Sequence, residues 1–269
     1  MNREFPCNGT IRAEVKLSAG RLEIVASERT TATVSITALD NNEASIQAVA
    51  ESRVEMVEGR HLRVSAPEHG GWRLFRRAKL LVRVEMPLDS ALTVHIASAD
   101  ASITGRYHDL VVNTASGDIE VEQVTGDTSV NTASGRIRLG DVGGALRVNS
   151  ASGDIRTGHV GGNVVVHTAS GDVEIGAADG DAKVNTASGD VSFGVTRQGE
   201  IRVNTASGDV VIGVAAGTGV WLDLNTASGR TTSDLSMPAS APPAAVAHNL
   251  TVKARTASGD ISLRRVVPA

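Results

Sequence analysis

The 269-residue sequence predicts an all-β fold, a single-chain parallel β-solenoid (β-helix) with 18-residue laps and an irregular β-rich N-terminal cap. Three observations predict it. A six-residue phrase, best written Asn-Thr-Ala-Ser-Gly-Asp, occurs nine times; apolar and polar residues alternate on both sides of it; and glycine-rich turns separate the alternating runs. A fixed period with small variations is typical of repeat architectures. The nine copies begin at His95, Asn113, Asn131, Asn149, His167, Asn185, Asn204, Asn225 and Arg255.

The spacing of the copies sets the size of one lap. The first six copies follow at intervals of 18 residues, and the last three intervals are 19, 21 and 30 residues. At about 3.3 Å per extended residue, 18 residues reach about 60 Å, enough for one lap around a narrow core. Stacked laps pair in parallel and in register, about 4.8 Å apart, and bury a continuous interior. Propeller blades need about 40 residues or more and are excluded. A flattened and a three-sided cross-section both fit the spacing, and the handedness stays open.

Each lap is expected to hold two strands joined by a tight turn. Upstream of the phrase, apolar residues such as Leu146 and Val148 alternate with polar ones. Downstream the alternation resumes, as at Val173 and Ile175. This period of two is typical of strands with one buried face. The Ser-Gly-Asp step between the two runs is a turn in which glycine takes positive φ.

Three columns of the stacked phrase carry specific expectations. Alanine stands in all nine copies, from Ala97 to Ala257, which predicts a crowded inward corner. The threonine column accepts Ile96, so we expect it to face inward, with hydroxyls that bond neighbouring laps. The asparagine column predicts a structural ladder of amides.

Four segments are predicted along the chain. Residues 1–94 form a β-rich N-terminal capping region continuous with the solenoid, with turns at 40–42, 58–59 and 69–71. Residues 95–233 are the regular repeats. Residues 234–249 form a Pro/Ala-rich loop, which cannot pair in a sheet and should be dispensable for folding. Residues 250–269 are the final lap, expected to close the stack, and a tail.

Composition narrows the function classes. The net charge is −4 without a basic stripe, which disfavours nucleic acid as a partner. Six aromatic residues are few for a globular enzyme of this size. Cys7 is the single cysteine, so no intrachain disulfide can form. The sequence shows neither an apolar signal core nor 18 consecutive apolar residues, so we expect a cytoplasmic protein without membrane insertion.

The chain resembles the bacterial β-strand-repeat domains of unknown function family 4097, often labelled "putative adhesins". The resemblance rests on the repeated Asn-Thr-Ala-Ser-Gly-Asp phrase with isoleucine after it, and on residues 22–27 and 221–226. The return through residues 252–261 is similar to that of actinobacterial members. The resemblance covers nearly the whole chain. It implies a β-solenoid fold and no established activity.

A column of aspartates is the strongest candidate for a metal site. Stacked carboxylates about 4.8 Å apart repel one another, and a divalent cation such as Ca²⁺ would relieve them. Against this, the calcium-binding nonapeptide Gly-Gly-x-Gly-x-Asp is absent, and Arg136 and Arg230 interrupt the column. An aspartate after a turn glycine also commonly accepts backbone N–H bonds. We expect a structural column, with Ca²⁺ as the alternative. Its members are Asp100, Asp118, Asp154, Asp172, Asp190, Asp209 and Asp260.

The other chemically suggestive residues also have structural interpretations. A nucleophilic serine needs a positioned base and an oxyanion hole, and no histidine column accompanies the repeated serines. His95 and His167 stand four laps apart in the asparagine column. The glycine pairs at 143–144 and 161–162 precede no helix and are turn glycines rather than phosphate loops. The sequence thus predicts no catalytic, cofactor-binding or metal residues, no cofactor, and no enzyme.

The function predicted is a non-catalytic rigid β-solenoid scaffold or protein-interaction module, whose flat repeated faces bind one or more protein partners. The apolar points expected on these faces are Val111, Val165, Val211, the Trp221 region and the Pro/Ala loop. The alternative is an adhesin-like surface or polysaccharide-binding protein, although sugar-binding grooves usually carry stacking aromatics. The sequence specifies neither the partner nor the oligomeric state.

Overall fold

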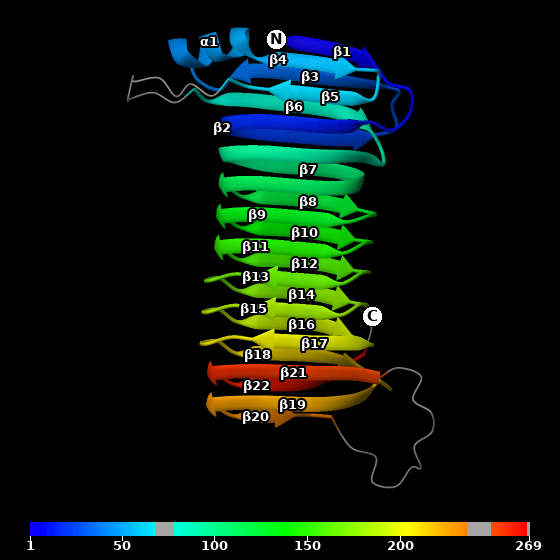
Figure 1. The fold of residues 1–269 in the computed structure, drawn as a ribbon, viewed down its shortest axis with the longest axis vertical. Helices are drawn as coiled ribbons and strands as arrows, with labels where there is room; N and C mark the ends of the chain where they lie inside the picture. Colours follow the sequence, from blue (N-terminus) through cyan, green and yellow to red (C-terminus); the bar gives the residue numbers. More distant parts are fainter. Residues whose placement is uncertain (68–77, 236–248, 268–269) are drawn as a thin grey trace. The chain divides into compact units, whose positions relative to one another are not determined.

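The computed structural model describes residues 1–67, 78–235 and 249–267 and divides into two compact units, Met1–Gly140 and Asp141–Ala269. Strands stack lap upon lap in each unit (Figure 1), so the predicted all-β solenoid is confirmed. The expected turn at 69–71 and most of the expected loop at 234–249 lie outside the described residues. The predicted segment boundaries at 94, 233 and 249 stay predictions.

The described residues of the first unit form one helix, α1 (Glu43–Glu51), and ten strands. The strands are β1 (Asn2–Pro6), β2 (Arg12–Ser27), β3 (Thr31–Ala38), β4 (Arg53–Val57), β5 (His61–Ser65), β6 (Leu80–Pro87), β7 (Ser90–Ser116), β8 (Ile119–Val124), β9 (Thr128–Ser134) and β10 (Ile137–Val142), the last ending just beyond the unit. The parallel laps begin here, because β7 pairs in parallel with β2, β8 and β9.

The N-terminal strands depart from purely parallel pairing. β1 with β3, β3 with β6, and β4 with β5 are antiparallel pairs. The expected turn at 58–59 joins β4 to β5, and both Glu58 and Gly59 have positive φ there. The expected turn at 40–42 instead leads into α1, which the all-β prediction missed. Asn42 caps this helix, with its Oδ1 accepting the backbone N–H of Ala44 at 3.3 Å.

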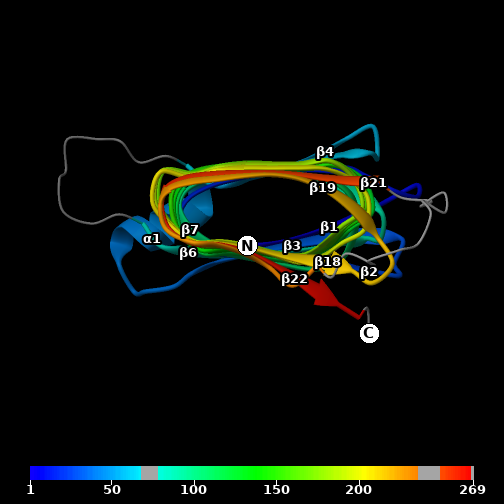
Figure 2. The ribbon, with the colours of Figure 1, turned by 90° about the horizontal axis from the view of Figure 1, so that it is seen from below.

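In the second unit, twelve strands of the described residues are arranged as two faces. One face has the order β11 (Leu146–Ser152), β13 (Val164–His167), β15 (Ala182–Asn185), β17 (Gly199–Asn204), β21 (Asn249–Ser258) and β19 (Gly219–Ser228). The other has β12 (Ile155–Val160), β14 (Val173–Ala178), β16 (Val191–Thr196), β18 (Val210–Ala215), β22 (Ile261–Val266) and β20 (Thr231–Ser233). Each lap contributes one strand to each face, and Figure 2 shows these laps as flattened rings with two long sides. The flattened alternative therefore holds.

The expected position of the final lap is wrong. Strands β21 and β22 pair with β17 and β18 on one side and with β19 and β20 on the other. The last lap of the chain thus fills a place between two earlier laps. The lap formed by β19 and β20 is at the end of the stack instead, because each of these strands pairs with one strand within the described residues.

The buried residues follow the predicted alternation of apolar and polar positions, but the prediction for one column is wrong. Val166, Ile175 and Ile212 are fully buried in the second unit, and isoleucines and leucines fill the first. The threonine column faces inward as predicted, although most of its hydroxyls donate within the lap, as Thr168 Oγ1 does to Ser170 O at 2.9 Å. The alanine column is exposed in all nine copies, so the inward corner was a wrong prediction. Alanine there lies on the outside of the turn, before the glycine.

The turn glycine is required by close backbone approach as well as by conformation. Gly171 has φ +113°, and a Cβ built on it would lie 2.4 Å from Gly153 O in the neighbouring lap. Any side chain would force the two laps apart. This explains the glycine found at this position in eight of the nine copies, the first copy having Ala99 instead.

Candidate functional site

In the second unit, the aspartate column forms a ladder through the backbone. Each carboxylate accepts the backbone N–H of the equivalent residue in the neighbouring lap. Asp154 Oδ1 accepts from Asp172 at 3.2 Å, and Asp172 Oδ1 accepts from Asp190 at 2.9 Å. Asp190 Oδ1 accepts from Asp209 at 2.8 Å, and Asp209 Oδ1 from Asp260 at 2.7 Å. The predicted backbone bonds are confirmed; that the column functions without Ca²⁺ stays a prediction.

In the first unit, an arginine ends the same ladder. The backbone N–H of Arg136 donates to Asp118 Oδ1 at 3.0 Å, and its Nη2 lies 2.7 Å from Asp118 Oδ2. The backbone bond is the largest cause that lowers the pKa of Asp118, and the guanidinium adds to it. The described residues contain no group of three or more His, Cys, Asp or Glu side chains arranged to hold a metal ion.

The asparagine ladder is present as predicted. Asn131 Nδ2 donates to Asn113 Oδ1 at 3.0 Å, and Asn204 Nδ2 donates to Asn185 Oδ1 at 2.9 Å. His167 fits the column because its Nδ1 lies 3.1 Å from Asn185 Nδ2. These amides bond one another between laps, which supports their structural role.

A second polar ladder escaped the sequence analysis. Asp109 Oδ1 accepts the backbone N–H of Asp127 at 3.1 Å in the first unit. In the second unit, Asn163 Oδ1 accepts from Asp181 at 3.1 Å, and Asp181 Oδ1 accepts from Glu200 at 2.8 Å. This ladder could have been predicted from the sequence, because a Gly-Asp or Gly-Asn pair recurs at 126–127, 162–163 and 180–181.

The apolar points expected on the faces are less exposed than predicted. Val111, Val165 and Val211 are half-buried. Val165 pairs in register with Arg147 and Lys183, whose apolar stems can cover it. Trp221 is 57% exposed, and Lys253 Nζ lies 5.8 Å from the centroid of its ring. Of the four predicted points that lie within the described residues, Trp221 is the exposed one, and the fifth, the Pro/Ala loop, lies mostly outside them.

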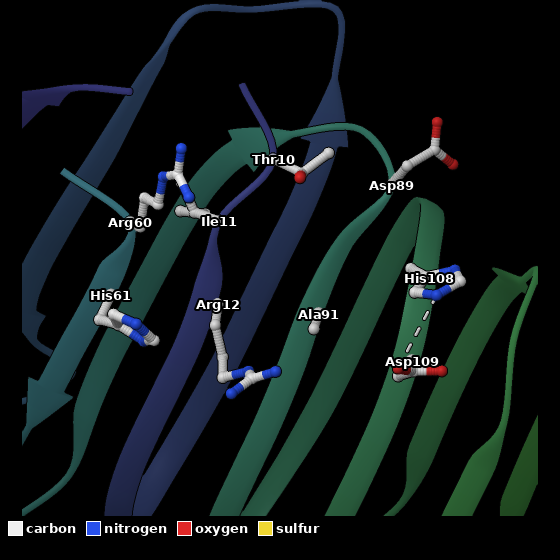
Figure 3. Close-up of a pocket in the computed structure, with 9 residues that line it drawn as sticks. All are labelled: Thr10, Ile11, Arg12, Arg60, His61, Asp89, Ala91, His108 and Asp109. Atoms are coloured by element: carbon white, nitrogen blue, oxygen red, sulfur yellow. Dashed lines mark ion pairs between the residues drawn. The ribbon is translucent and has the colours of Figure 1, made fainter. Parts of the chain in front are cut away.

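The first unit also contains a surface pocket of about 410 Å³, called the basin below, which no sequence pattern indicated (Figure 3). It combines basic, acidic and small side chains from the turn before β2, from β2 itself, from β5 and its preceding turn, and from β7 with its preceding turn. It is lined by Thr10, Ile11, Arg12, Arg60, His61, Asp89, Ala91, His108 and Asp109.

Strand register explains the hollow. Arg12 pairs with His61 on one side and with Ala91 on the other. Because Ala91 carries a methyl group, space is left beside the long Arg12 side chain. The backbone beneath is fixed by bonds from Arg12 N to Arg60 O at 2.8 Å and from Ala91 N to Ile11 O at 2.9 Å.

The basin has a surplus of positive charge near Arg12 and Arg60. Asp89 is neutralised by Arg106, whose Nε and Nη2 lie 2.6 and 2.7 Å from its two oxygens and hold the pKa of this carboxyl below its usual range. Asp109 lies 4.0 Å from His108 Nε2. In the described part of the chain, Arg12 and Arg60 form no ion pair.

This arrangement suits binding better than chemistry. Thr10 supplies the basin's hydroxyl group, and no hydrogen bond within the described residues connects it to His61 or His108. A nucleophile without a positioned base is weak. Arginine side chains without partners, in contrast, are well suited to carboxylates and phosphates.

Comparison with known proteins identifies the fold. The family model described as Toastrack DUF4097 matches residues 13–266. The crystal structure of "Putative lipid binding protein" from Parabacteroides distasonis ATCC 8503 has a TM-score of 0.56 at 16% identity, covering 98% of this chain and 96% of that one. A "putative adhesin" from the same organism has a TM-score of 0.50 at 14% identity, with the same coverage. No curated protein matches the sequence. Among the described residues, no helix is long and apolar enough to cross a membrane.

Proposed function

We propose, from the premise that the chain belongs to the Toastrack DUF4097 family, that it is a non-catalytic, rigid β-solenoid scaffold that binds a protein partner. One observation carries the proposal. The repeated polar side chains bond to the protein's own backbone and to one another, as Asp172 does to Asp190 and Asn185 to Asn204. Side chains used in this way hold laps in register rather than act on a substrate.

Rigidity follows from the stacking. Each inner lap of the second unit is paired on both faces with the laps on either side, and Val184, Val203 and Ile212 between the faces are fully buried. Stability in such arrays is close to a sum over neighbouring laps. A surface built this way keeps its side chains at fixed spacings and needs little ordering when a partner binds.

Site-specific photo-crosslinking tests the scaffold role. A benzophenone amino acid is placed at Val165 on β13 or, as the matched position on the opposite face, at Ser192 on β16. After irradiation in native lysate, we expect a discrete crosslinked protein from one face, which excess unlabelled chain competes away. If neither position captures a protein while both variants melt like the unmodified chain, the proposed partner binding is wrong. Fractionation of the same lysate tests the expected cytoplasmic location.

A second candidate, adhesin-like polysaccharide binding, is favoured by Trp221. An exposed tryptophan is a stacking surface for sugar rings, but Lys253 already lies over this ring. Quenching or a shift of tryptophan fluorescence on addition of polysaccharides, lost in Trp221→Ala, would favour this candidate over the scaffold.

A further inference from the structure

We infer that the basin beside Arg12 and Arg60 docks an acidic segment of the protein partner, whose Asp or Glu carboxylates bind these two guanidinium groups. The inference rests on the proposed function, because it names the chemistry of the partner. It concerns a surface formed mainly by the N-terminal strands, to which His108 and Asp109 of the first repeats also contribute.

The charge of this surface favours an acidic ligand. Several exposed arginines of the first unit have a carboxylate partner, as Arg106 has in Asp89 and Arg83 in Glu23. Arg12 and Arg60 have none among the described residues, although both are exposed. An exposed guanidinium without an internal partner loses no existing ion pair when it binds an external carboxylate.

The geometry of the two arginines favours an extended ligand. Figure 3 shows the guanidinium groups of Arg12 and Arg60 pointing in different directions rather than converging on one point. A single small anion would contact one of them, whereas an extended acidic segment presents carboxylates at successive positions. Alternate residues of an extended chain lie about 6.6 Å apart. A hollow of about 410 Å³ is in the range that accepts several side chains.

The negative charges of the basin lie away from Arg12 and Arg60. Arg106 neutralises Asp89, but Asp109 keeps a carboxylate at the edge of the basin. An acidic segment is therefore attracted to the side that holds Arg12 and Arg60 and repelled from Asp109. The basin therefore has a positive side and a negative side. Asp109 should weaken the binding of the same acidic ligand that Arg12 and Arg60 attract.

This polarity permits a test with effects of opposite sign. The full chain is titrated into a fluorescently labelled peptide of alternating Glu and Gly at low ionic strength, and anisotropy is recorded. We expect Arg12→Ala/Arg60→Ala to weaken binding at least tenfold. Arg21→Ala/Arg138→Ala, which removes two exposed arginines of the same unit outside the basin, should leave binding unchanged.

Asp109→Asn should strengthen binding about threefold. Its amide oxygen can still accept the backbone N–H of Asp127, as Asn163 does for Asp181 in the second unit. Thermal melting establishes that all variants are folded. A peptide of alternating Gln and Gly is the neutral control, and it should not bind.

Three results would overturn the inference: equal loss from the two double variants, weaker binding by Asp109→Asn, or displacement of the peptide by equimolar inorganic phosphate. The last would show a simple anion site instead of a peptide site. Failure here is distinguishable from failure of the scaffold role, because crosslinking at Val165 or Ser192 does not depend on the basin.

Discussion

The backbone N–H of Asp190 donates to Oδ1 of Asp172, 2.9 Å away in the neighbouring lap. Two residues of like charge are thereby joined, because the contact runs from a backbone dipole to a carboxylate rather than between carboxylates. Asp172, Asp190 and Asp209 are each both donor and acceptor in the ladder. The column that most resembled a cation site thus bonds each lap to the next through the backbone.

Removing one acceptor from the ladder should cost stability. Asp172→Ala leaves the N–H of Asp190 without its partner, and we expect a loss of about 1 kcal/mol in the free energy of unfolding. Asp172→Asn keeps an acceptor oxygen and removes a like charge, so it should be close to neutral. Urea denaturation of both variants measures the difference. Equal losses would mean that the carboxylate charge, rather than its hydrogen bond, is what the fold needs.

Acid should weaken the fold through Asp118. The backbone N–H of Arg136, followed by its guanidinium, lowers the pKa of this carboxyl in the folded state. A group of this kind adds stability above its unfolded pKa, about 3.9, and loses it as the pH falls through the lower folded value. The free energy of unfolding should therefore decrease below about pH 4. Denaturation midpoints between pH 2.5 and 6 (test conditions spanning roughly that pKa) should fall less steeply in Asp118→Asn; parallel curves would contradict this role.

Two turn glycines allow the cost of a positive φ to be measured separately from the cost of crowding between neighbouring laps. Gly217 has φ +82° with no atom within 4 Å of a built Cβ, whereas Gly171 combines φ +113° with a carbonyl oxygen at 2.4 Å. Gly217→Ala should cost about 1–2 kcal/mol through backbone strain. Gly171→Ala should cost at least twice as much, because the laps must also move apart. Melting temperatures that fall equally would show that lap-to-lap approach is unimportant.

One whole lap should be removable, but half a lap should not. Deleting residues 167–184 joins Val166 to Asn185, so every column continues in phase with the loss of one lap's burial. Deleting residues 167–175 sets turns against strands and outward residues against the core. We expect the first variant to be soluble and monodisperse in size-exclusion chromatography and the second to aggregate. Similar damage from both would contradict the 18-residue lap.

The fold was largely predictable because repetition makes local signals mutually consistent. Val148, Val166 and Val184 occupy the same position of successive repeats, and they pair with one another in register in the stacked strands. Helix α1 was missed because Asn42 and its neighbours are equally good turn residues, and the apolar pattern that follows is short. The exposure of the alanine column could not be inferred, since a methyl group fits a crowded interior and a bare turn equally well.

The candidate site was less predictable than the fold. Arg12, Arg60 and Asp89 are far apart in sequence and belong to no repeat, so no spacing relates them. They meet because β2 pairs with both β5 and β7. The hollow itself depends on Ala91 lying beside Arg12, which is a matter of register between strands about 80 residues apart. Single-sequence patterns carry no information of that kind.

The place of the last lap has a consequence for protein synthesis. Ile201 and Leu222 both pair with Val252, so β19 has the register to pair directly with β17 while the C-terminal strand is still on the ribosome. We expect the nascent chain to adopt that temporary pairing and the completed chain to replace it. A protein truncated before β21 would then contain stacked laps throughout, but β19 would pair with β17 instead of with β21.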